Sequence, residues 1–129
     1  MATLKTALTL TSVDTSSDAL SLSLTDSLTV VSPSINPSKI SVTTTGGNNI
    51  IQPNTDGQTY YVFVHHTGVD SSGSAVTSTL GVELTGDVAI GKLAAGEFMF
   101  MPVGGHSLGV QLQASAGTIV AEYAYFTKG

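Results

Sequence analysis

The chain has 129 residues, of which 41% are hydrophobic and 10% are charged, and its formal net charge is −5. This length is typical of one domain, so we expect a single domain spanning residues 1–129. A net negative charge disfavours nucleic-acid binding, which needs Lys or Arg to neutralise phosphates, and no apolar run predicts a membrane-spanning helix. The absence of cysteine excludes disulfides, thiolate metal ligands and a cysteine nucleophile.

Basic side chains are few, and all of them are lysines: Lys5, Lys39, Lys92 and Lys128. An average soluble domain has about a quarter of its residues charged, so this chain has little surface charge to keep copies apart. Ser and Thr fill most polar positions, and a hydroxyl group costs less to desolvate in an interface than a charged group does. The composition therefore favours self-association or attachment to a partner.

Alternating apolar and polar residues predict strands in the N-terminal third. Residues 4–10 place their leucines on one face, and residues 20–25 alternate Leu with Ser and Thr. Asp26-Ser27 then predicts either a hairpin turn or a bulged continuation into the apolar residues 28–31. Residues 32–38 contain two prolines and are expected to form a loop or an edge crossing. We interpret residues 1–31 as an N-terminal arm or edge layer of the same domain.

The middle of the chain contains the strongest strand signal. Residues 39–45 alternate again, and the glycines and asparagines of residues 46–49 predict a turn, as do residues 53–57. Residues 58–66 are apolar on both faces, which is typical of a central strand. Residues 69–74 are expected to form a polar loop.

The C-terminal half shows the same sequence pattern, with short predicted strands separated by turns. Strands are predicted at residues 76–84, 88–92, 97–101, 108–114 and 118–127, with Gly86-Asp87 as a turn and Pro102 ending the third of them. No window of 11 residues keeps a helical stripe free of Gly, Pro or Ser/Thr clusters. We therefore predict an all-β fold, a jelly-roll-like β-sandwich of roughly eight to ten short antiparallel strands.

Three histidines are the candidates for imidazole chemistry or metal binding: His65, His66 and His106. Side chains of adjacent strand residues point to opposite faces, so His65 and His66 cannot both reach one metal without a bulge. One of them could combine with His106 and a carboxylate such as Asp70. We favour the interpretation that these histidines are structural or lie on the surface.

Paired carboxylates and one glycine-rich cluster are the remaining candidates for catalysis. Glu83 with Asp87, or Glu97 with Glu122, could act as an acid and a base, but solubilising surface charges explain them more simply. Residues 104–107 (Gly-Gly-His-Ser) are more typical of a turn than of an oxyanion hole. Gly91-Lys92 is followed by Leu93 and not by Ser or Thr, so no phosphate-binding loop is present. We predict no catalytic residue, no cofactor and no metal ligand.

Aromatic and methionine side chains are the candidates for an interface. Tyr60, Tyr61, Tyr123 and Tyr125 could stack against sugar rings, although core or interface packing is the more frequent role of such residues. Met99 and Met101 share one strand face, and methionine adapts well to a partner surface. Our predicted interface residues are Met99, Met101, Tyr123 and Tyr125.

Two segments carry a resemblance to a known class of proteins. Residues 91–102 (GKLAAGEFMFMP) and 118–126 (TIVAEYAYF) resemble small structural proteins of tailed bacteriophages, especially phages that infect cyanobacteria. The matching region begins near Tyr60 and runs to the C-terminus. The resemblance implies a jelly-roll-like virion protein, often a trimer or ring, which is made in the host cytoplasm and decorates the capsid or joins parts of the tail. No functional residues carry over.

Composition and resemblance together lead to one leading hypothesis and three alternatives. The leading hypothesis is a non-enzymatic protein that decorates or cements a capsid, with itself and other virion proteins as partners, without nucleic acid or a membrane. A tail or fibre component that binds carbohydrate is the first alternative, and a stand-alone ligand-binding β-sandwich is the second. An enzyme that uses His106 and Ser107 is the weakest.

Overall fold

The structure is a computed structural model, and it describes residues 2–14, 18–45, 48–51, 58–86, 88–104 and 109–129. This part of the chain contains nine strands and no helix, which confirms the predicted all-β fold. The strands are β1 (Ala2–Ser12), β2 (Leu20–Val42), β3 (Asn48–Ile51), β4 (Tyr60–His66), β5 (Leu80–Leu84), β6 (Val88–Leu93), β7 (Phe98–Val103), β8 (Val110–Ala114) and β9 (Ile119–Lys128).

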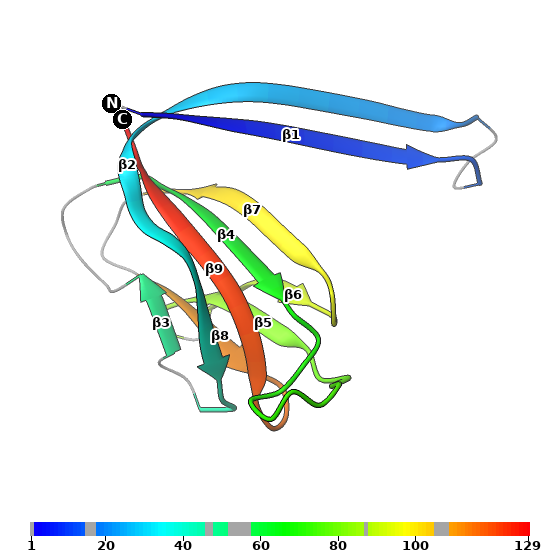
Figure 1. The fold of residues 1–129 in the computed structure, drawn as a ribbon, viewed down its shortest axis with the longest axis vertical. Coiled ribbons are helices and arrows are strands. Elements are labelled where there is room, and N and C mark those ends of the chain that lie inside the picture. The colour runs from blue at the N-terminus through cyan, green and yellow to red at the C-terminus, as the bar shows by residue number, and fades with distance from the viewer. Residues whose placement is uncertain (1, 15–17, 46–47, 52–57, 87, 105–108) are drawn as a thin grey trace.

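Two antiparallel sheets pack against each other as a β-sandwich (Figure 1). The first sheet has the strand order β1-β2-β9-β4-β7, and the second has the order β3-β8-β5-β6. Residues 58–66 were predicted to form a central strand, and β4 does lie between β9 and β7. The jelly-roll connectivity stays a prediction.

The core lies between the two sheets and follows from strict alternation along the strands. On β4, Val62 and Val64 point inward, and Leu80 and Leu112 meet them from the second sheet; all four are nearly inaccessible to solvent. Gly91 lies close to this core, because a Cβ added there would come within 3.0 Å of the Met99 sulfur. Hydrophobic burial between the inner faces of the two sheets therefore stabilises the sandwich.

The strand β2 is 23 residues long and pairs with two different strands. Its residues 20–30 pair with β1, and its residues 30–42 pair with β9. Of the two alternatives predicted for residues 32–38, the loop is wrong, because the strand continues through them, and the edge position is correct. Of the two predicted at Asp26-Ser27, the hairpin turn is wrong and the strand continues, without a bulge in its ladder with β1. Over residues 31–42, β2 has β9 on one side and no described strand on the other, which is where a strand tolerates proline. Register shifts between Val30 and Ser38 absorb the remaining irregularity.

Pro102 does not end its strand either. The strand β7 runs through Pro102 to Val103, and it is an edge strand of the first sheet. An edge strand needs backbone donors on one side only, so it accommodates the missing N–H of proline. The sequence pattern located the strand correctly but could not show that it lies at an edge.

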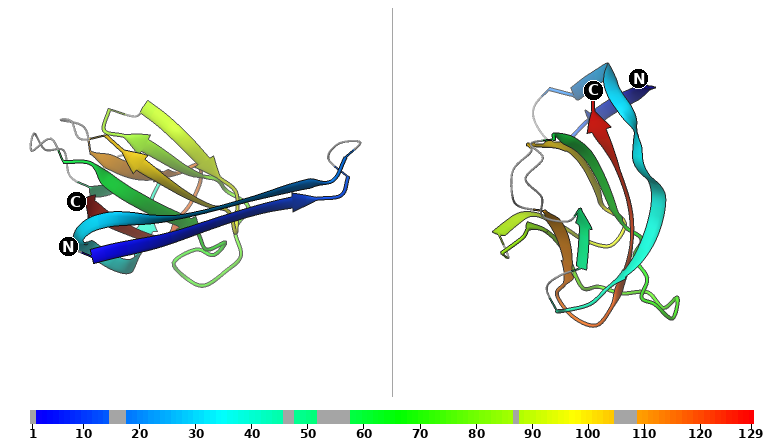
Figure 2. Two further views of the ribbon diagram at one scale, coloured as in Figure 1. Left: turned by 90° about the horizontal axis from the view of Figure 1, so that it is seen from above. Right: turned by 90° about the vertical axis from the view of Figure 1, so that its left-hand side faces the viewer.

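An arm projects from the sandwich (Figures 1 and 2). It consists of β1 and residues 20–30 of β2, which pair over eleven consecutive positions from Ala2↔Val30 to Ser12↔Leu20. The arm crosses above the first sheet and extends beyond the body, so that its far end has no second layer from its own described chain. We use the term "arm" for this hairpin from here on.

The different environments of two leucines lead to a stability prediction. Leu112 is fully buried between the sheets, whereas Leu24 on the arm is 62% exposed. We expect Leu112→Ala to lower the free energy of unfolding by about 2–5 kcal/mol, because it leaves a cavity in the core. Leu24→Ala is the matched control and should cost less than about 1 kcal/mol. Urea denaturation measures both values, and equal losses would contradict this description of the core.

Candidate interface formed by the N-terminal arm

Leucine side chains predominate on one face of the arm, which also carries the pair Thr6↔Asp26 and Ser12. Leucines from β1 and β2 lie directly opposite each other in three cross-strand pairs: Leu4↔Leu28, Leu8↔Leu24 and Leu10↔Leu22. Leu20 extends the same face toward the tip. From Leu8 outward the leucines are exposed, with accessible fractions of 39% to 62%. We call this surface the leucine face.

The opposite face of the arm is covered by small polar side chains. Thr3, Thr9 and Thr11 on β1 lie opposite Thr29, Ser23 and Ser21 on β2, and Ala7 lies opposite Thr25. The single charge on this face is Lys5, which pairs with Ser27. The arm is therefore amphipathic at a period of two, like a strand that covers a core, yet it has no core of its own.

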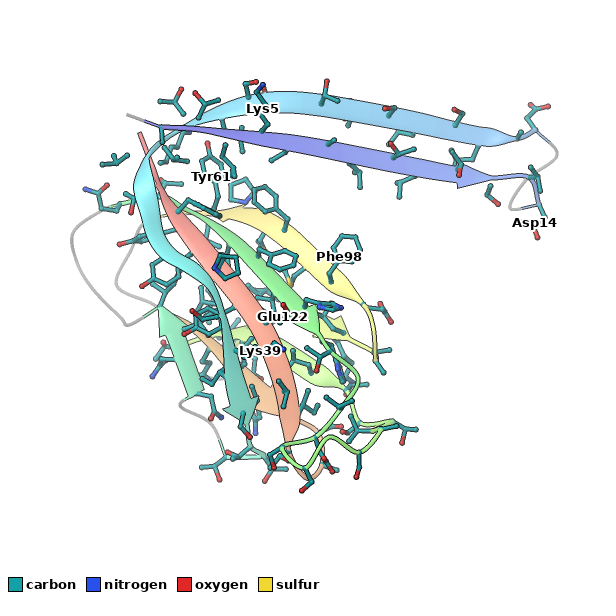
Figure 3. The ribbon with its side chains drawn as sticks, viewed as in Figure 1. Lys5, Asp14, Lys39, Tyr61, Phe98 and Glu122 are labelled. Carbon is teal, nitrogen blue, oxygen red and sulfur yellow. The ribbon has the colours of Figure 1, made fainter. Side chains whose placement is uncertain are left out.

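A groove of about 700 Å³ separates the arm from the edge strand β7. Leu8 and Leu24 line it on the arm side, and Phe98 and Phe100 line it on the sheet side. Phe98 is 64% exposed. Figure 3 shows Tyr61 and Phe98 on the side of the first sheet that faces the arm. Exposed leucine and phenylalanine side chains thus line a largely apolar surface, which is typical of an interaction site. The cross-strand pair Thr6↔Asp26 is its polar part.

Three apolar residues outside the main core are buried on the strands at the base of the arm. Val30, Tyr61 and Ala124 are buried, although none of them belongs to the core between the sheets. The Tyr61 ring stacks on Phe100 with centroids 6.1 Å apart and planes at 9°. The backbone N–H of Gly129 donates to Thr29 O at 2.9 Å. The base is therefore held, while the leucine face farther out is open.

The four predicted interface residues lie elsewhere. Met99, Tyr123 and Tyr125 pack against the core between the sheets, and Met101 shares their inward strand face. All four are half-buried. Tyr125 also meets Tyr60 edge to face, with ring centroids 5.8 Å apart. Whether these residues contact a partner stays a prediction, and the exposed apolar surface is instead the leucine face with Phe98 and Phe100.

His65 and His66 point to opposite faces of β4, as the strand pattern predicted. His66 is fully buried, its Nε2–H donates to Ser78 O at 2.9 Å, and its Nδ1 accepts from the Gly68 N–H at 3.0 Å. His65 lies on the outer face, where its Nδ1 is 3.2 Å from Glu122 Oε1. His66 therefore serves to satisfy backbone groups inside the fold, and His65 forms a surface pair with Glu122.

The other candidates for chemistry are spread over separate elements. Asp70 accepts hydrogen bonds from the N–H groups of Ser72 and Ser74 within one loop, Glu97 accepts from the Ala94 N–H, and Glu83 accepts from Gln111. Asp87 and the cluster at residues 105–107, including His106, lie outside the described residues. Among those that are described, no three His, Cys, Asp or Glu side chains gather as metal ligands would, and no helix could cross a membrane.

The sequence pattern predicted strands in the arm but did not identify it as the candidate interface. The missed signal lies in residues 2–12 and 20–30, two segments of equal length. Each has leucines on one face and only Ser, Thr, Ala and Lys on the other. Once the strands pair, this pattern produces one apolar stripe. Phe98 and Phe100 alternate with Met99 and Met101, and only the three-dimensional structure shows which pair points outward.

The contrast between the two histidines can be measured. We expect His66→Leu to reduce the free energy of unfolding by about 2–4 kcal/mol, because Gly68 N–H and Ser78 C=O lose their buried partner. His65→Leu removes only a partly exposed pair and should cost less than about 1 kcal/mol. Thermal and urea unfolding of both variants provide the measurement. A harmless His66→Leu would show that the ring has no structural role.

No protein-family model matches the sequence, and no curated protein matches it. The assignment of function therefore starts from the arm, the groove beneath it and the sequence pattern.

Proposed function

We propose that this protein is a non-enzymatic structural component of a bacteriophage particle, which decorates or cements the capsid, and that the arm makes its contacts with neighbouring molecules. In this role the sandwich forms the bulk of the bound protein, and the leucine face is the surface that contacts its neighbours. Its partners are other copies of the chain and the major capsid or other virion proteins.

The arm is the observation that carries this proposal. A two-stranded hairpin is marginally stable in water unless its apolar face is covered. Five leucines on the arm are exposed, and Phe98 and Phe100 face them across the groove. A partner that covers this surface stabilises the arm and gains hydrophobic free energy of about 25 cal/mol per Å² of apolar area removed from water.

Composition supports the same assignment. Charged residues make up 10% of the chain, so approach of a second molecule meets little repulsion or desolvation cost. The resemblance of residues 91–102 and 118–126 to phage structural proteins supplies the biological setting, a virion. It also supports the finer expectation of jelly-roll connectivity.

The proposal is tested on purified particles from the source of the gene. Quantitative mass spectrometry should find this chain in many copies per particle, and labelling in negative-stain images should place it on the capsid surface. A dozen or fewer copies, together with a monomeric purified protein, would exclude capsid decoration. A label confined to the tail would favour the tail alternative.

We expect attachment of the protein to particles to depend on the side chains of the leucine face, and not only on the presence of the arm. Leu24→Asp places a second carboxylate on that face, beside Asp26, and we expect it to weaken attachment to stripped particles by about tenfold or more, since it removes one apolar contact. Thr25→Asp adds the same charge one residue away on the hydroxyl face and is the matched control. Sedimentation of protein with particles measures both. Equal effects would argue against the leucine face as the contact.

A further inference from the structure

The exposed strand edges of the described residues are protected to different degrees. Residues 31–42 of β2 have no described neighbour on one side, and they contain Pro33, Pro37 and Lys39. The edge strand β7 contains Pro102, β3 has only four residues, and β6 carries Lys92 beside a register shift with β5. Each of these features discourages pairing with another chain. The remaining edge is β1, which has eleven residues, no proline and an unbroken register with β2. The exposed edge of β1 is therefore the one suited to accept another strand.

The strand β1 is also complementary to itself. Its central residue is Ala7, and an antiparallel pairing of two copies about Ala7 places residue i opposite residue 14 − i. All eleven positions then have a partner: Ala2 meets Ser12, Thr3 meets Thr11, Leu4 meets Leu10, Lys5 meets Thr9, Thr6 meets Leu8 and Ala7 meets Ala7. Shifting the centre by one residue leaves only nine pairs.

This register preserves the two faces of the arm. Residues opposite each other in an antiparallel ladder project to the same side, so the leucines of both copies lie on one face, together with Thr6 and Ser12. Thr3, Lys5, Ala7, Thr9 and Thr11 of both copies lie on the other face. A half-step shift, with residue i opposite 13 − i or 15 − i, would place the leucines of the two copies on opposite faces. The register also keeps the two Lys5 ammonium groups about 14 Å apart along the strand, four residues at the usual rise.

We propose that two copies of this chain associate through their β1 edges, paired antiparallel about a two-fold axis at Ala7. The product is a continuous four-stranded sheet in the order β2-β1-β1-β2, with one leucine face shared by both copies. A sheet needs three or more strands with an apolar face to be stable on its own, and a lone hairpin has only two. The four strands of the dimer meet this requirement. The inference rests on the proposed function, because it names the first contact of the assembling protein.

Cysteine substitution tests the register directly, since the chain has no native cysteine. Ala7→Cys places two thiols opposite each other at a Cα separation of about 5 Å, which suits a disulfide. Mild oxidation of the full chain should therefore convert most of it to a covalent dimer. Thr3→Cys alone and Thr11→Cys alone are the controls, because each thiol would lie about 27 Å from its own copy. An equal mixture of these two variants should cross-link.

A second test uses charge at Thr9, whose partner within the arm is the neutral Ser23. Thr9→Lys puts an ammonium group opposite Lys5 of the second copy, twice per dimer, and Thr9→Glu puts a carboxylate there. We expect the dissociation constant of Thr9→Lys to exceed that of Thr9→Glu by about tenfold at low salt. The difference should shrink as salt is added. Analytical ultracentrifugation measures both constants.

Three results would overturn the inference: a chain that stays monomeric at 100 µM or sediments as a trimer, a Thr3→Cys variant that cross-links as fast as Ala7→Cys, or Thr9 variants with equal dissociation constants. The proposed function has a separate readout, the attachment of Leu24→Asp to particles. If Thr9→Lys is monomeric yet attaches normally, the capsid role stands without the pairing of β1. If the dimer forms but does not attach to particles, the pairing stands and the capsid role fails.

Discussion

A strand hairpin has only two faces and no interior, so it cannot bury its own apolar side chains. In the sandwich this constraint is satisfied, because each sheet covers the inner face of the other. In the arm it is not, because the leucines from Leu8 outward face a groove and the space beyond the body. The need to cover this one surface connects the low charge of the chain, the open β1 edge and the proposed assembly.

The arm and the body share β2, and this sharing determines how the arm is held. In chain order, the strand first pairs with β1 over residues 20–30, then passes two prolines and several register shifts, and continues along β9 to Val42. At the transition Val30 is buried, and the stacked rings of Tyr61 and Phe100 lie on the same side of the first sheet. Packing at the base therefore fixes the point at which the arm departs, while its farther leucines remain free for a partner.

Much of the fold could be predicted from the sequence, because alternation reports directly which residues share a strand face. It located β4 in the centre of a sheet and placed His65 and His66 on opposite sides. At Pro33 and Pro37 it left a loop and an edge crossing open, since local sequence does not show which strands lie beside β2 there. It also missed the candidate interface, because a pattern of leucines identifies an apolar face but not what covers it.

The length of β2 has a mechanical consequence. One covalent strand runs from the tip of the arm to the far end of the first sheet, over 23 residues. Its hydrogen bonds to β9 lie perpendicular to the strand, so tension transmitted along β2 strains many of them together instead of opening them one by one. Force borne by the arm would consequently be resisted by shear of the sheet, which is a stronger geometry than opening its hydrogen bonds one at a time.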